Sequence, residues 1–121
     1  MSETVLEVLC YRYLKLSEHV FFTVDIAHIK GILDQVPSQK ECSPFLQQYH
    51  QSNPELFIEL SNGEIWALGD SVGFVTLQAN QSQRIPPILQ SWTNDLSIKQ
   101  LYMIDRNLYI LLDPLQPRSH T

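Results

Sequence analysis

The sequence consists of short runs of β-branched, aromatic and leucine side chains, and turn-forming residues separate these runs. Residues 7–16 alternate roughly between two faces, and residues 20–24 return after the turn Ser17-Glu18-His19. Such runs favour strands over helices, because β-branched and aromatic side chains suit a pleated surface. The chain is therefore predicted to open with a pair of strands. Both faces of the first strand carry apolar residues, so we expect both to be covered.

A hairpin is predicted in the middle of the chain, where residues 56–60 and 64–68 flank Asn62-Gly63. This dipeptide favours a two-residue type I′ turn, which requires positive φ at both central positions. Another strand follows at residues 72–77, with Gly73 as a candidate β-bulge.

The last third of the chain predicts a closing hairpin of residues 99–104 and 107–112 across Asp105-Arg106. Before it, residues 84–87 are expected to be extended, because each proline fixes its own φ and restricts the residue before it. Residues 88–95 are expected to be irregular or briefly helical.

The spacing of the apolar residues changes after residue 24. Ile26, Ile29, Ile32 and Leu33 follow helical spacing, and Asp25 stands where an N-cap belongs, so one short helix is predicted there. Residues 38–54 are rich in Gln, Ser, His and Pro and predict a crossing loop.

The sum is a mostly β protein of about seven strands, mainly antiparallel, which favours a small barrel or a sandwich with one or two short helices. The length of 121 residues fits one domain. We assign that domain to residues 1–116 and a flexible C-terminal tail to residues 117–121.

The charge pattern limits the classes of partner. The net charge is −5, and the eight Lys and Arg residues are spread along the chain, so neither nucleic acid nor an anionic membrane surface is expected as a partner. No apolar run is long enough to span a bilayer, and the acidic start lacks the features of a signal peptide. A cytoplasmic location with Cys10 and Cys42 as free thiols is expected.

No motif for catalysis, metal binding or cofactor binding is found. The four histidines lack the spacing of a zinc site, and the chain has no Walker loop, dinucleotide fingerprint or nucleophile elbow. We therefore predict no enzyme activity, no catalytic residue, no metal and no cofactor. One enzymatic alternative stays open, a nucleophile pair formed by Cys42 and His50 if these side chains meet in space.

Three segments, taken in order, resemble the CheW-like family of chemotaxis coupling proteins. They are residues 20–33, with Val-Asp-Ile at their centre; residues 56–77, with Leu-Gly-Asp-Ser-Val near their end; and residues 85–115, which close with Tyr-Ile-Leu-Leu-Asp-Pro-Leu. The last match is the best of the three. Together they cover most of residues 5–115.

The resemblance implies small antiparallel β-barrels of the CheW-like, SH3-like double-barrel type. Members of the family usually carry a middle block with an Asn-Leu-Arg-Gly turn, and residues 38–54 stand in its place without it. One barrel is therefore expected to be incomplete.

The resemblance also implies a non-catalytic adaptor in chemotaxis-type or related two-component signal transduction. Its expected partners are a histidine kinase, a receptor or another CheW-like module. The candidate protein-binding residues are Ile29, Ile32, Leu33, Pro86, Pro87 and Trp92, each of which core packing would also explain.

A second hypothesis belongs to another class, an unrelated small β-barrel that serves as a structural subunit and assembles with itself or with a larger complex. A stable oligomer formed without any signalling partner would favour this second hypothesis.

Overall fold

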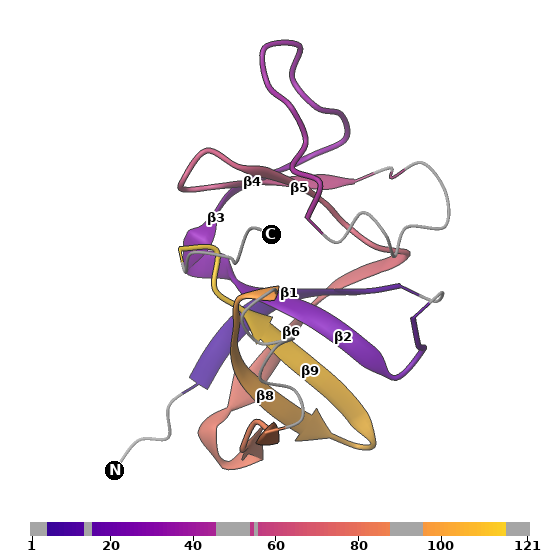
Figure 1. Ribbon diagram of the computed structural model, residues 1–121, viewed down its shortest axis with the longest axis vertical. Helices are drawn as coiled ribbons and strands as arrows, with labels where there is room; N and C mark the ends of the chain where they lie inside the picture. The colour runs from indigo at the N-terminus through magenta and orange to yellow at the C-terminus, as the bar shows by residue number, and fades with distance from the viewer. Residues whose placement is uncertain (1–4, 14–15, 46–53, 55, 88–95, 116–121) are drawn as a thin grey trace.

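The chain folds into two β-sheets (Figure 1). The computed structural model describes residues 5–13, 16–45, 54, 56–87 and 96–115. The strands are β1 (Val5–Arg12), β2 (Val20–Asp25), β3 (Ile29–Leu33), β4 (Phe57–Leu60), β5 (Ile65–Ala67), β6 (Ser71–Gln78), β7 (Ser82–Gln83), β8 (Ile98–Ile104) and β9 (Asn107–Leu112). The 3₁₀ helices η1 (Ile26–His28) and η3 (Ala79–Gln81) connect strands. The expectation of a mostly β chain is confirmed.

The larger sheet brings the two ends of the chain together. Its strand order is β6-β1-β2-β9-β8-β7, and the smaller sheet has the order β3-β4-β5. The opening strand pair and the closing hairpin meet where β2 lies beside β9, and these two strands are parallel. All other strand pairs in the described residues are antiparallel, as predicted.

Neither sheet closes into a barrel within the described residues, so the prediction of closed barrels is wrong. The two edge strands of the six-stranded sheet, β6 and β7, follow one another in the chain through the three residues of η3, but they do not pair with each other in the described residues. The strand β7 has two residues and pairs with β8, which leaves the outer edge of β6 without a strand. The smaller sheet has three strands, too few to curl into a barrel.

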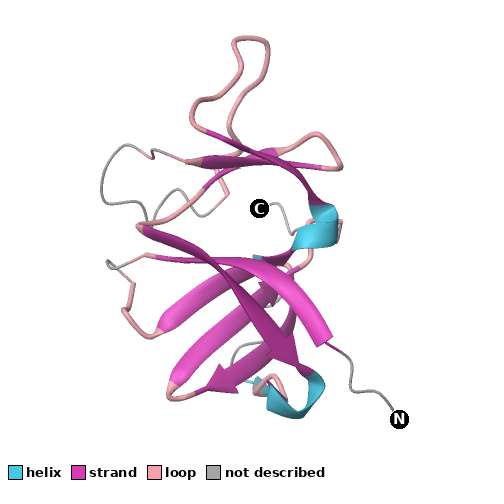
Figure 2. Cartoon of the chain, turned by 180° about the vertical axis from the view of Figure 1, so that it is seen from behind, coloured by secondary structure: helices cyan, strands magenta, loops and turns pink. Residues whose placement is uncertain are grey.

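The predicted helix over residues 26–33 is also wrong. Only Ile26–His28 is helical, and the chain continues as strand β3 (Figure 2). The predicted N-cap is present, because the Asp25 carboxylate accepts a hydrogen bond of 2.9 Å from the Ala27 N–H. β-branched isoleucines and Gly31 are poor helix formers, and pairing with β4 supplies the hydrogen bonds that a longer helix would have made.

The turns differ in type from the prediction. At Asn62-Gly63 only Gly63 has positive φ, and the Gly63 N–H donates to the Leu60 carbonyl, which is the pattern of a three-residue loop. The two-residue turn with positive φ at both positions lies instead at Asp105-Arg106, with φ of 49° and 71°. Gly73 forms no bulge, since β1 and β6 pair in continuous register from end to end.

The main core lies between the two sheets. The larger sheet contributes Leu9, Tyr11, Phe22, Val24, Ile110 and Leu112, and the smaller sheet contributes Ile58, Leu60 and Trp66. On the opposite face of the larger sheet, Val8, Leu77 and Leu111 form a second buried cluster. Strand β1 is therefore covered on both faces, as its alternation predicted.

Candidate functional site

The first candidate surface is the outer edge of the smaller sheet, formed by β3. Ile32 is paired with the fully buried Ile58 and lies on the same face of the sheet, yet 47% of its surface is exposed. Ile29 packs against the main core, while Leu33 is half-buried beside Phe57. Of the three predicted residues on this strand, Ile32 is therefore the one that the fold leaves most open to a partner.

Charged groups frame this edge strand. Lys30 is exposed, and the register shift between Ile29 and Gly31 leaves it outside the pairing with β4. On β4, the Glu59 carboxylate forms an ion pair with the Lys40 ammonium. The hydrogen bond from Lys40 holds the pKa of Glu59 below its usual value, so this carboxylate stays ionised near neutral pH. Because Glu59 alternates with Ile58 along β4, this ion pair lies on the face of the sheet opposite to Ile32.

The other predicted binding residues lie elsewhere. Pro86 and Pro87 are exposed and follow β7, at the far edge of the larger sheet, whereas β3 belongs to the smaller one. The prolines and the β3 residues therefore lie at edges of different sheets. Trp92 lies outside the described residues.

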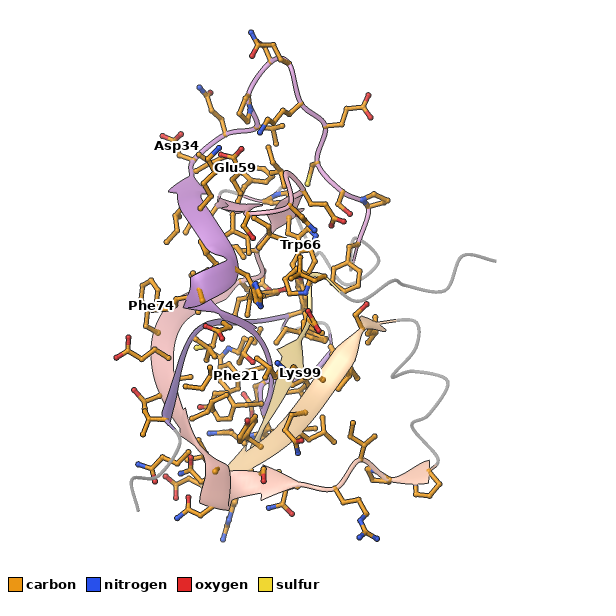
Figure 3. The ribbon with its side chains drawn as sticks, turned by 90° about the vertical axis from the view of Figure 1, so that its left-hand side faces the viewer. Phe21, Asp34, Glu59, Trp66, Phe74 and Lys99 are labelled. Carbon is orange, nitrogen blue, oxygen red and sulfur yellow. The ribbon has the colours of Figure 1, made fainter. Side chains whose placement is uncertain are left out.

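A second candidate surface, at strand β6, was not predicted from the sequence. Phe74 is 67% exposed, and its side chain projects outward from the ribbon (Figure 3). It lines a shallow depression of about 460 Å³ together with Ile26 of η1, Val75, Thr76 and Glu7. The alternation of β6 places Phe74 on the same face as its partner Leu9 in the core. Alternation therefore predicts a core position for Phe74, and its exposure is visible only in the structure.

The chemistry of the described thiols argues against a nucleophile. Burial raises the pKa of both Cys10 and Cys42, so both side chains are protonated thiols at neutral pH. The Cys42 thiol donates to the carbonyl of Ser43 at 3.5 Å. His50, the proposed base, lies outside the described residues. Among the described side chains, no group of three or more His, Cys, Asp and Glu could hold a metal ion.

Comparison with known proteins leaves the family open. No protein-family model matches the chain, and no curated protein has a significantly similar sequence. In the part of the chain that the structure describes, no helix has the length and apolar character needed to cross a membrane. The candidate surfaces must therefore be judged on their geometry.

Proposed function

We propose that this protein is a non-catalytic adaptor that resembles CheW and acts in chemotaxis-type or related two-component signal transduction. Its partner is a histidine kinase, a receptor or another CheW-like module. The observation that carries the proposal is the exposed side chain of Ile32 on the edge strand β3. An exposed apolar side chain of this kind is suited to contact another protein through side-chain packing.

The two-sheet architecture supports the proposal of a CheW-like adaptor. A CheW-like chain without the usual middle block is expected to keep one sheet system nearly whole and the other reduced. The larger sheet has six strands and the smaller one has three, and residues 34–56 connect the first two strands of the smaller sheet. The raised pKa values of the two thiols also weigh against the enzymatic alternative.

A second candidate function is that of a structural subunit that assembles with itself or with a larger complex. The observation that favours it is the exposed Phe74 on β6, an edge strand of the larger sheet. The two functions differ in what the protein recruits, because only the adaptor needs a signalling protein as its partner.

The adaptor proposal is tested by cross-linked affinity capture from native lysate with mass spectrometry. We expect the wild-type protein to enrich a chemotaxis-type kinase, a receptor or a CheW-like protein. Ile32→Glu should abolish that enrichment, because it places a charge in the apolar contact. The matched control is Met103→Glu, since Met103 of β8 is 42% exposed and belongs to the other sheet. Recovery of no signalling protein with the wild type would refute the adaptor role.

A further inference from the structure

In the described part of the chain the two sheets have four edge strands, and three of them carry features that discourage pairing with another strand. Strand β7 has only two residues, and strand β5 has three residues with Cys42 bridged beside Ile65. Strand β3 carries Lys30 at an interruption of its register. Short length, charge and irregular register are the usual protections of edge strands.

Strand β6 has none of these protections. It is eight residues long, contains no charged residue and no proline, and pairs with β1 in continuous register. Among the described residues, no strand pairs with its outer side. At its centre stands Phe74, the most exposed of the large apolar side chains that the structure describes. A long, uncharged edge of this kind is a template for one more strand.

The charges on β6 and around it indicate which strand fits. Strand β6 has no charged side chain that could attract a charged partner strand. A charged strand that paired with β6 would lose hydration without gaining an ion pair. The nearest described carboxylate in the depression is Glu7 on β1, one strand behind the edge. If two copies paired edge to edge, their β1 strands would stand about 14 Å apart, three inter-strand spacings. At physiological salt, the interaction between exposed charges falls off over about 8 Å. The negative net charge of the chain therefore does not oppose such a pair.

We propose that β6 pairs antiparallel with β6 of a second copy of this chain, about a two-fold axis at Phe74. Residues that face each other across two antiparallel strands point to the same side of the sheet. In a symmetric pair with its axis at Phe74, this ring therefore faces its own copy, and Val72 faces Thr76 of the other copy. Every contact across the axis joins uncharged side chains, and the larger sheets of both copies become one continuous sheet.

This contact closes on itself, so it gives a dimer and no larger assembly. It also leaves both β3 edges open. The pairing therefore does not depend on the adaptor proposal: affinity capture decides the adaptor role, whereas the mass in solution decides the dimer.

The test is sedimentation equilibrium of the purified full chain over a range of concentrations. We expect the wild type to reach twice the monomer mass of 14.0 kDa. Phe74→Lys and Phe74→Glu should each weaken the dimer about tenfold or more, because two side chains of like charge then face each other from Cβ atoms about 5 Å apart. Met103→Lys, a charge on an exposed residue of β8, should leave the dimer unchanged.

An equimolar mixture of Phe74→Lys and Phe74→Glu should form the dimer again, because opposite charges then meet at the axis. This rescue distinguishes a self-facing Phe74 from a merely damaged surface, and circular dichroism verifies that each variant is folded. Three results would overturn the proposal: a wild type that is monomeric at its highest soluble concentration, a Phe74→Lys dimer as tight as that of the wild type, or a mixture that stays monomeric.

Discussion

Gly69 lies where the chain approaches β6, packed against the backbone of β1. A Cβ at this position would stand 2.1 Å from the carbonyl oxygen of Arg12, 2.8 Å from its carbonyl carbon and 3.1 Å from Cδ1 of Tyr13. The obstructing atoms are backbone atoms, which cannot swing away as the end of a flexible side chain can. The same carbonyl accepts a hydrogen bond of 2.7 Å from the Asp70 N–H. Relief of the clash therefore requires the entry to β6 to move away from β1.

We expect Gly69→Ala to lower the free energy of unfolding by about 2–4 kcal/mol. Forced overpacking costs about 1–3 kcal/mol. Loss or distortion of the Asp70 to Arg12 hydrogen bond adds about 0.5–1.5 kcal/mol. The variant tests the fold directly, because the contact exists only if the chain after β5 crosses the end of β1.

The matched control is Gly31→Ala, the same chemical change on the edge strand β3. No atom lies within 4 Å of a Cβ built on Gly31, and its φ is not in the left-handed region. Alanine there reduces the conformational freedom of the unfolded chain, so we expect a gain of about 0.4–1 kcal/mol. Two identical substitutions should thus change stability in opposite directions.

The assay is urea unfolding followed by tryptophan fluorescence. With a denaturant slope of about 1–3 kcal/mol per molar urea, a loss of about 3 kcal/mol lowers the unfolding midpoint by about 1–3 M. A Gly69→Ala midpoint equal to that of the wild type would show that the close approach to Arg12 does not exist. A Gly31→Ala midpoint that falls as far as that of Gly69→Ala would show that the loss is common to any glycine substitution.

Three further substitutions test other parts of the structure. Thr23 is fully buried, and its hydroxyl donates a hydrogen bond of 3.1 Å to the Ile110 carbonyl. Thr23→Val should therefore lower the free energy of unfolding in urea by about 1 kcal/mol. An unchanged urea midpoint would contradict that hydrogen bond. Arg106 has a φ of 71°, which glycine adopts more readily than arginine. Arg106→Gly should therefore raise the free energy of unfolding by about 0.5–1 kcal/mol and raise the thermal midpoint. A lowered midpoint would argue against the two-residue turn. Lys40→Met should destabilise the protein near neutral pH but not in acid. The pKa of Glu59 is lower in the folded protein than its unfolded value of 4.5, so its ion pair with Lys40 stabilises the wild type above pH 4.5, and this stabilisation is lost as the pH falls through the folded pKa. The measurement is the urea midpoint of both proteins as a function of pH. A difference between the two midpoints that persists in acid would refute the prediction.

The candidate surfaces show how far sequence could predict a site. Ile32 was singled out for its place in an apolar pattern, and the structure finds it exposed, but on a strand and not on a helix. Phe74 was assigned only to a strand, because alternation alone places it on the core face beside Leu9. The structure nevertheless leaves 67% of its surface exposed. Exposure of this kind depends on contacts between distant segments and has no local signal.

Local chemistry determined the strands that carry their own periodicity. The boundaries of β2, β8 and β9 follow from alternation and from the turn at Asp105-Arg106, and Asp25 acts as the N-cap that its side chain predicts. These features depend on neighbours in sequence, so the sequence contains all that is needed to predict them.

Tertiary structure decided what depends on partners far along the chain. Residues 29–33 have a pattern that fits either a helix or a strand, and pairing with β4 selected the strand. The parallel contact between β2 and β9 joins segments separated by most of the chain. Within the described residues β7 has only two residues, and the larger sheet does not close into a barrel. Pairing across such distances is selected by the burial of a shared core, a property of the whole chain and not of any single segment.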